Sequence, residues 1–308
     1  MSVATASRPE STAAVGSTSW ILQKVQRVAL HVAVIALTVA WVVPTLGLLV
    51  SSFRPASDII TTGWWTALSP PFSFTLKNYS DMLDQSNLGS AIFNSFMVSI
   101  PSTVIPVTIA AFAAYAFAWM KFPFRDWIFL AFVGLLAVPL QLTFIPVLTF
   151  FVSHGIVPDN LESIGLPPWT GLWLAHAGYG LPYSTYLLAN FFRALPSDLF
   201  ESAEIDGAGT LTVFFRIILP LSVPALASLI IFQFLWVWND LLVALIYVGG
   251  APEVAPLTVS LANLTNSLGQ GYQLLTAAAF FSMIIPLVVF LSLQRYFVRG
   301  ILAGSVKG

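Results

Sequence analysis

The chain of 308 residues carries 12 Lys and Arg, 13 Asp and Glu and no Cys, so only 8% of it is charged while 57% is hydrophobic. A soluble domain carries about 25% charged residues. Too few polar side chains are present to cover a globule of this size, and the composition therefore predicts a protein embedded in lipid. The formal charge of −1 argues against a nucleic-acid partner, which needs clustered Lys and Arg. The lack of cysteine excludes disulfides, thiol catalysis and Cys-ligated zinc.

Charge-free intervals predict how often the chain crosses the bilayer, since a helix needs roughly 20 apolar residues to span about 30 Å of hydrocarbon. Six intervals between charged residues exceed that length. Trimmed at turn residues, they predict transmembrane helices over residues 28–52, 92–119, 127–151, 169–192, 222–247 and 273–297. Kinks or breaks are expected at the prolines inside them: Pro101, Pro106, Pro139, Pro146, Pro182 and Pro286. The predicted fold is an all-α membrane protein with six spans.

The basic residues predict the orientation, because cytoplasmic loops hold an excess of positive charge. Arg54 and Lys77 fall on one side of the predicted bundle, and the ten other basic residues fall on the other. Both termini are therefore expected in the cytoplasm. Residues 1–18, rich in Ser, Ala and Thr, predict a disordered cytoplasmic tail ahead of a transmembrane domain over 19–308. The tail is not expected to be a signal peptide, because the first apolar run begins only after Arg27.

The three predicted outer loops cover residues 53–91, 152–168 and 248–272. The first is long and contains Trp64 and Trp65, which indicate either an ordered external subdomain or an aromatic belt at the membrane surface. The third has no Lys or Arg and several small polar residues. It suits contact with a polar solute or a partner protein, and simple solvation explains it equally well.

The predicted cytoplasmic loop between the fourth and fifth spans, over 193–221, contains the densest cluster of charge. Ser197 or Asp198 can cap a helix of about two turns, and Gly207 can end it in a left-handed conformation. A second helix, capped by Thr210, is expected to run to Pro220. The apolar residues of this loop exceed what a solvated loop needs. They indicate either a docking surface for another protein or a loop packed against its own helices.

The residues of this loop resemble a known signature. Glu201-Ser202-Ala203, then Gly207, then Ile217-x-Leu219-Pro220 is similar to the E-A-A-x3-G-x9-I-x-L-P pattern of binding-protein-dependent ABC importer permeases, and only Ser202 departs from it. Other stretches, such as I-F-N-S-F at 92–96 and K-F-P-F-R at 121–125, resemble permeases of the maltose-type carbohydrate uptake family. The chain is most similar to the smaller, six-span permease of that family.

This resemblance implies the type I ABC importer permease fold and a multi-subunit complex. The expected partners are a second homologous permease, two ATPase subunits, an extracytoplasmic solute-binding protein and the lipid bilayer. The outer loop over 249–272 would face the binding protein. The residues expected to couple the chain to the ATPase are Glu201, Ser202, Ala203, Asp206, Gly207, Ile217, Leu219 and Pro220.

The chain is not expected to hydrolyse ATP or to be an enzyme by itself. A phosphate-binding P-loop needs Lys followed by Ser or Thr, whereas the four lysines are followed by Val25, Asn78, Phe122 and Gly308. No cofactor or metal is expected to bind this chain, since His31, His154 and His176 are scattered. ATP and Mg would be bound by the partner ATPase.

Polar residues inside spans predict a solute path, because such groups usually face the interior of the bundle or water. Gln233, Trp236 and Asp240 share a helical face with Asn239 beside them, and Tyr183 and Tyr186 form a weaker stripe on the previous span. Amides, a carboxylate and aromatic rings could bind a sugar. The alternative interpretations are solvation of Asp240 near the outer surface, or bonding between helices.

Three classes of function follow from these features. The favoured one is the permease of an ATP-driven sugar importer that works by alternating access. An intramembrane enzyme is disfavoured, because the ionisable groups inside the spans, such as Asp240 and His176, lie on different predicted helices. A self-sufficient secondary transporter or channel for a polar solute is the remaining alternative, and the lack of an evident internal repeat argues against it.

Overall fold

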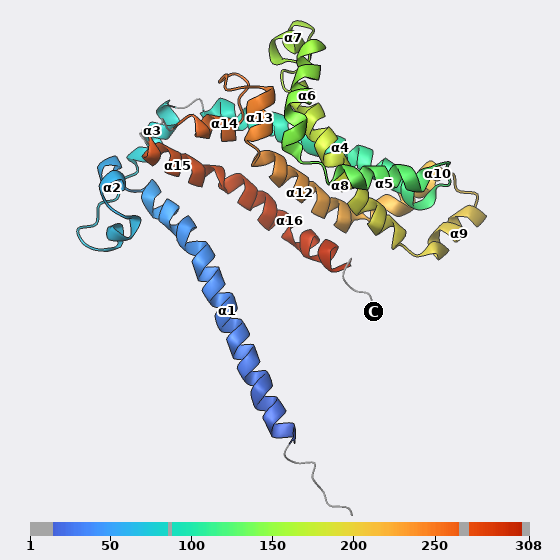
Figure 1. Ribbon diagram of the computed structural model, residues 1–308, viewed down its shortest axis with the longest axis horizontal. Coiled ribbons are helices and arrows are strands. Elements are labelled where there is room, and N and C mark those ends of the chain that lie inside the picture. Colours follow the sequence, from blue (N-terminus) through green and yellow to red (C-terminus); the bar gives the residue numbers. More distant parts are fainter. Residues whose placement is uncertain (1–14, 86–87, 265–270, 304–308) are drawn as a thin grey trace, which may run out of the picture.

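The computed structural model describes residues 15–85, 88–264 and 271–303, and the regular structure within these ranges is helical throughout (Figure 1). The predicted all-α class is confirmed. Of the predicted disordered tail over 1–18, residues 1–14 lie outside the described residues, and a helix begins at Val15.

The helices follow one another with short connections. The first half of the chain contains α1 (Val15–Ser52), α2 (Ala56–Thr61), the 3-10 turn η1 (Trp64–Leu68), α3 (Lys77–Gln85), α4 (Leu88–Trp119), α5 (Arg125–Leu135), α6 (Leu140–Ser153) and α7 (Pro158–Ser163). The second half contains α8 (Thr170–Arg193), α9 (Ser197–Ile205), α10 (Thr210–Val213), the π-helical turn η2 (Phe214–Ile218), α11 (Leu219–Leu221), α12 (Val223–Trp238), α13 (Leu242–Tyr247), α14 (Leu257–Ala262), α15 (Tyr272–Ser282) and α16 (Ile284–Ala303).

Four helices among the described residues are long and apolar enough to cross a membrane: Gln23–Ser52, Leu88–Trp119, Leu140–Ser163 and Tyr272–Gln294. A helix pair bent by 75°, Thr210–Leu221 with Val223–Trp238, could make a fifth crossing. The helix α8 is long enough at about 1.5 Å per residue but is not in this set. The apolar helices agree with a membrane protein, while the six predicted spans and their direction stay predictions.

Three of the predicted spans are interrupted, and the breaks have identifiable causes. Pro139 cannot donate to the carbonyl of Leu135, which is where α5 ends, and Pro286 has the same relation to Ser282 at the end of α15. The break between α12 and α13 lies at Asp240, whose carboxylate accepts backbone N–H groups of α13. The breaks near Pro139 and Pro286 agree with the prediction that these prolines kink or interrupt their spans. The unbroken helix predicted over 222–247 is wrong in its interior.

The helix α8 is continuous where the sequence predicts a break. A break was expected at Gly180-Leu181-Pro182, but α8 runs without interruption from Thr170 to Arg193 with Pro182 inside it. The two helices α4 and α8 pack along each other at the centre of the bundle, and α12 packs against α4, α8 and α16 (Figure 1). This packing supports α8 along its length.

A proline inside α4 creates one of the contacts between α4 and α8. Pro101 has no N–H, so the carbonyl of Met97 lacks its helical partner. The indole Nε1 of Trp173 on α8 donates to this carbonyl at 2.8 Å. The helix is not broken at Pro101, because a neighbouring side chain satisfies the carbonyl that the proline leaves unpaired.

The helix α1 extends away from the rest of the molecule, as the blue helix in Figure 1 shows. It touches mainly η1 and α15 near its C-terminal end. Val28, Leu30, Ile35 and Trp41 are more than half exposed, so its apolar surface has no cover within the described chain.

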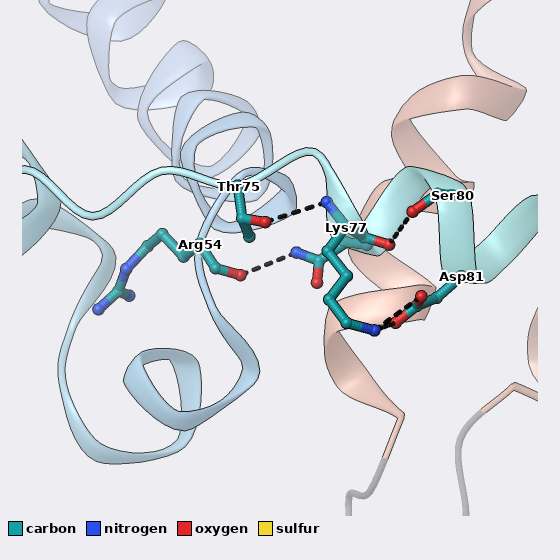
Figure 2. Close-up of polar contacts among 6 residues, drawn as sticks. Arg54, Thr75, Lys77, Ser80 and Asp81 are labelled. Atoms are coloured by element: carbon teal, nitrogen blue, oxygen red, sulfur yellow. Dashed lines mark hydrogen bonds and ion pairs between the residues drawn. The ribbon is translucent and has the colours of Figure 1, made fainter.

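The region after α1 is an ordered subdomain, which favours that interpretation of residues 53–91. Arg54 is only 2% exposed and donates to the carbonyls of Asp58 and Thr62 at 3.0 and 3.3 Å. Asn78 on α3 donates from Nδ2 to the carbonyl of Arg54 at 2.8 Å. Figure 2 shows the ion pair of 2.6 Å between Lys77 and Asp81 on the surface of α3. The bonds of Arg54 and Asn78 attach α2 and α3 to the segment that follows α1.

Candidate functional site

The first candidate site is the segment from α9 to α11, which contains the residues of the predicted signature. The helix α9 ends as predicted: Gly207 has φ +71° and follows the helix end at Asp206. The predicted second helix also exists, running over Thr210–Leu221 with a π-helical turn inside it. Two consecutive helices separated by a left-handed glycine therefore form a projection at one end of the bundle (Figure 1).

The predicted caps of these helices are wrong. Pro196 occupies the position before α9 and Gly209 the position before α10, and neither helix has a side-chain cap bond. The hydroxyl of Ser197 donates to the carboxylate of Asp198 at 3.4 Å. The carbonyl of Thr210 accepts a bond of 3.3 Å from the hydroxyl of Tyr115 on α4. Neither bond acts as a cap, because neither satisfies a backbone N–H group at the start of a helix.

One face of this segment packs against the bundle. The ring of Phe200 stacks on Trp119 with centroids 3.7 Å apart, and Trp119 donates from Nε1 to the carbonyl of Phe192 at 3.0 Å. Phe214 is 1% exposed and stacks on Phe112 with centroids 4.6 Å apart. Movement of this segment would therefore be transmitted directly to α4 and α8.

The opposite face of the segment is open. Ile205 is 86% exposed, Leu211 65% and Phe215 54%, and Glu201 and Asp206 are exposed beside them. Part of the segment packs on its own helices, as one interpretation of the loop expected, and its other face is an exposed apolar surface with acidic residues, on which docking of another protein stays a prediction. Of the signature residues, Ala203 is buried, Ile217 and Leu219 are half-buried, and Ser202, Gly207 and Pro220 are exposed.

The second candidate site is a cavity of about 310 Å³ between α8 and α12. Its lining consists of two tyrosines, a phenylalanine, a tryptophan, a glutamine and a glycine: Tyr179, Gly180, Tyr183, Phe232, Gln233 and Trp236. None of these residues carries a charge. Aromatic faces beside an amide and phenolic hydroxyls can stack on and hydrogen-bond to a neutral polyhydroxylated solute.

Gln233 is held in place by α4 and α8. Pro106 in α4 leaves the carbonyl of Ser102 without a helical donor, and Nε2 of Gln233 donates to that carbonyl at 3.3 Å. The absence of a side chain at Gly180 makes room for the amide, because a Cβ there would lie only 2.5 Å from Nε2. A close approach of backbone and amide thus fixes one wall of the cavity.

The structure brings together only part of the predicted solute path. Gln233, Trp236 and Tyr183 share the cavity, while Tyr186 stacks on Phe129 outside it. Asn239 donates to the carbonyl of Leu235 in its own helix at 2.7 Å. The sequence analysis missed Tyr179, which lies four residues before Tyr183 and so on the same helical face; this spacing could have revealed it.

Asp240 serves as a structural cap and lies outside the cavity lining. Its carboxylate accepts bonds from the backbone N–H groups of Val243 and Ala244 at 3.3 and 2.9 Å. Its Oδ2 also lies 3.7 Å from Nε2 of the fully buried His176. The interpretation that bonds Asp240 to a neighbouring helix therefore agrees with the structure.

Replacing Asp240 with alanine is expected to destabilise the chain by about 1–2 kcal/mol, because two backbone donors of α13 lose their acceptor. The measurement is thermal unfolding in detergent. Asn239→Ala is the matched control, since the Asn239 side chain bonds only within its own helix. An Asp240→Ala protein as stable as the control would contradict the capping role.

The fold and this pair of sites define a polytopic helical membrane protein with a helical projection at one end of its bundle. A family described as binding-protein-dependent transport system inner membrane component matches residues 93–303. The chain belongs to this family, whose members are the membrane-embedded components of such transport systems.

Relatives of known designation support this membership. The chain is 53% identical to the osmoprotective compounds uptake permease protein GgtD of Synechocystis, over 92% of this chain and 93% of the relative. It is 50% identical to the alpha-glucoside transport system permease protein AglG of Rhizobium meliloti, over 80% of this chain and 63% of the relative. It is also 30% identical to the diacetylchitobiose uptake system permease protein NgcG of Streptomyces coelicolor, over 90% and 86%.

Solved structures share the fold. A chain of a bacterial ABC transporter involved in the import of the acidic polysaccharide alginate superposes with a TM-score of 0.68 at 18% identity, covering 94% of this chain and all of that one. A second structure of the alginate transporter, in complex with an alginate pentasaccharide-bound periplasmic protein, gives a TM-score of 0.62 at 19% identity, covering 89% and 95%. The predicted importer-permease fold is confirmed at this level.

Proposed function

We propose that this chain is the permease subunit of an ATP-driven importer for a neutral, polyhydroxylated solute of the α-glucoside or osmoprotectant type. The observation that supports this most directly is the uncharged aromatic and amide lining of the cavity between α8 and α12. The designations of GgtD and AglG point to the same class of solute. The direction of transport is inward, from an external binding protein to the cytoplasm.

The cavity chemistry supports a neutral solute over an acidic one. An acidic polysaccharide such as alginate needs cationic partners for its carboxylates, and Arg is the usual residue for that contact. Phenolic hydroxyls and an amide bond instead to uncharged hydroxyl groups, while the rings of Trp236 and Tyr183 offer apolar faces. The low sequence identity to the alginate transporter fits a different solute.

The segment from α9 to α11 is proposed to contact the ATPase and to transmit its conformational change on ATP hydrolysis to the membrane helices. Its exposed face combines apolar side chains with the acidic residues Glu201 and Asp206, which suits insertion into a cleft of a partner ATPase. Its buried face is stacked on α4 through Phe200 and Phe214. ATP and Mg would be bound by that ATPase, and the ATPase-coupling residues would be Glu201, Ser202, Ala203, Asp206, Gly207, Ile217, Leu219 and Pro220.

The remaining assembly follows from the same proposal. Six spans with both termini in the cytoplasm put the segment from α9 to α11 on the ATPase side. A second homologous permease would complete the pathway, and the uncovered apolar surface of α1 supports contact with it or with lipid. The external solute-binding protein would dock at the other end, near the segment over 249–272.

Cysteine labelling tests the solute path, and the chain has no cysteine to interfere. Tyr183 and Tyr186 lie on the same helix and are 42% and 40% exposed, but only Tyr183 lines the cavity. In the assembled importer, Tyr183→Cys is expected to react with a polar maleimide and to be protected by an α-glucoside during turnover. Tyr186→Cys is the matched control and is expected to show no sugar-dependent protection.

Two results would contradict this assignment. Equal sugar protection at both positions would mean that the protection comes from a global conformational change. No reaction at Tyr183→Cys in any state would mean that the cavity is closed to solutes by side-chain packing.

A self-sufficient secondary transporter is the alternative function. Uptake by the purified chain in liposomes without an ATPase would favour that alternative.

A further inference from the structure

The connection between α4 and α5 forms a second cleft that the transport pathway does not use. It has a volume of about 550 Å³ and is lined by Lys121, Phe122, Phe124, Arg125, Asp126 and Trp127. It follows directly on the 32-residue helix α4, so it lies where that helix leaves the hydrocarbon. Trp119 at the end of α4 stacks on Phe200 of α9, so the cleft is at the same end of the bundle as the segment from α9 to α11.

The backbone of this connection is strained at an unusual residue. Phe124 has φ +61° and ψ 12°, and it is the one non-glycine residue with positive φ in the described chain. A bulky side chain in the left-handed region is disfavoured by steric clash between its Cβ and the backbone. Glycine would adopt this conformation without that strain. Strain of this kind is typical of binding sites, where the surrounding structure maintains it.

The strained turn directs apolar side chains outward. Phe124 is 75% exposed and Trp127 is 72% exposed. The helix α5 has no buried residue, and Leu130, one turn beyond Trp127 on the same face, is 58% exposed. A continuous apolar strip therefore leads from the cleft along α5 in the direction of the bilayer.

The same turn carries an excess of positive charge. Lys121 is exposed, and Arg125 donates from Nε to Asp126 at 2.9 Å and from Nη1 to the carbonyl of Met120 at 3.4 Å. These bonds fix the guanidinium beside the cleft and use two of its five donors. The cleft has one acidic and two basic residues. Arg193, which lies 4.3 Å above the ring of Phe129 on α5, adds a third cation nearby.

We propose that this cleft binds the phosphate headgroup of an anionic phospholipid through Lys121 and Arg125, with an acyl chain along Trp127 and Leu130. Basic residues and aromatic rings at the membrane–water boundary are the combination that recognises such lipids. A bound lipid would cover the exposed ring of Phe124 and thereby compensate for the strained backbone. Because the cleft adjoins Trp119 and α9, the lipid would sit beside the segment that is proposed to contact the ATPase.

Native mass spectrometry of the full chain, equilibrated with phosphatidylglycerol or phosphatidylcholine, tests this site. Neutralising both charges in the Lys121→Gln, Arg125→Gln double variant is expected to lower retained phosphatidylglycerol by about 25-fold, since each basic residue near an anionic surface contributes roughly fivefold. Phosphatidylcholine retention is expected to change little. The control is Lys24→Gln, Arg27→Gln, which removes the same charge from the distant helix α1.

A second variant separates lipid binding from folding. Phe124→Gly removes the strain, so it is expected to raise the midpoint of thermal unfolding by about 2 °C or more while lowering phosphatidylglycerol retention. Unchanged phosphatidylglycerol retention in both cleft variants would overturn the proposal. So would an equal loss of both lipids, which would show apolar contact without headgroup recognition. Loss of ATPase copurification with lipid retention intact would identify the surface as a protein contact and also overturn the proposal.

Discussion

Gly207→Val is expected to lower ATP-driven uptake by at least about tenfold while the chain still inserts into the membrane. Gly207 has φ +71°, and a residue with a Cβ is disfavoured there by about 1–2 kcal/mol, with β-branched residues disfavoured further. The end of α9 would relax to a different conformation and move Ile205 and Asp206 on the exposed face. Since about 1.4 kcal/mol corresponds to a tenfold change in rate, this strain is large enough to disturb transport.

A nearby glycine provides the matched control. A Cβ at Gly207 or at Gly209 meets no atom within 4 Å, but Gly209 has φ −68°, so Gly209→Val adds a side chain without left-handed strain. It is expected to keep most of the uptake. The measurement is uptake by the reconstituted importer, with copurification of the ATPase as a second readout. Full uptake by Gly207→Val would contradict the proposed role of this turn in coupling to the ATPase.

The helices of the segment from α9 to α11 were largely predictable because their signals are local in the chain. Gly207 ends α9 as expected, and the second helix, expected to run to Pro220, ends one residue later at Leu221. The predicted caps were wrong because the helices begin at Ser197 and Thr210 themselves, which leaves Pro196 and Gly209 at the cap positions. Sequence periodicity also could not predict which face of α9 would stack on Trp119.

The span interiors were less predictable, and the prolines show why. Pro139 and Pro286 interrupt their spans, whereas Pro101 and Pro182 lie inside continuous helices. The difference at Pro101 is a neighbouring donor, since Trp173 bonds the carbonyl that this proline leaves unpaired. A single sequence shows each proline but not the residue on another helix that satisfies its free carbonyl.

The cavity between α8 and α12 was predicted in part for a similar reason. The helical spacing of Gln233 and Trp236 correctly placed them near each other, but the same spacing suggested Asp240, which instead caps α13. Asp240 left the predicted face because its carboxylate competes for backbone donors and ends the regular helix before it. Gly180 matters because it has no side chain, which leaves room for the amide of Gln233. No pattern in the sequence indicates that these two residues meet.

Gly180→Ala is expected to be the most damaging single-methyl change in α8. The added Cβ would lie 2.5 Å from Nε2 and 2.8 Å from Oε1 of Gln233, which is 4% exposed, so the amide would have to shift away from α8. Its bond to the carbonyl of Ser102 would be lost, leaving an unpaired buried acceptor at a cost of about 1–3 kcal/mol. Both the thermal midpoint and the uptake are expected to fall.

Gly178→Ala is the matched control on the same helix, because a Cβ there meets nothing within 4 Å. It is expected to be neutral or slightly stabilising, since alanine is favoured over glycine inside helices by about 0.5–1 kcal/mol. A Gly180→Ala protein as stable as Gly178→Ala would contradict the close contact.

A double-mutant cycle assigns the effect to Gln233. Gln233→Ala alone leaves the Ser102 carbonyl unpaired, and adding Gly180→Ala to it is expected to cost little more, because the amide that would clash is already absent. The two substitutions should therefore be strongly non-additive, with a coupling free energy of about 1–3 kcal/mol. If the two losses of stability simply add, the effect of Gly180→Ala arises in the backbone of α8 and not from contact with Gln233. Strong non-additivity in stability would show that both substitutions act through the amide of Gln233. If both single variants also lose uptake, the wall of the cavity that this amide forms is needed for transport as well as for stability.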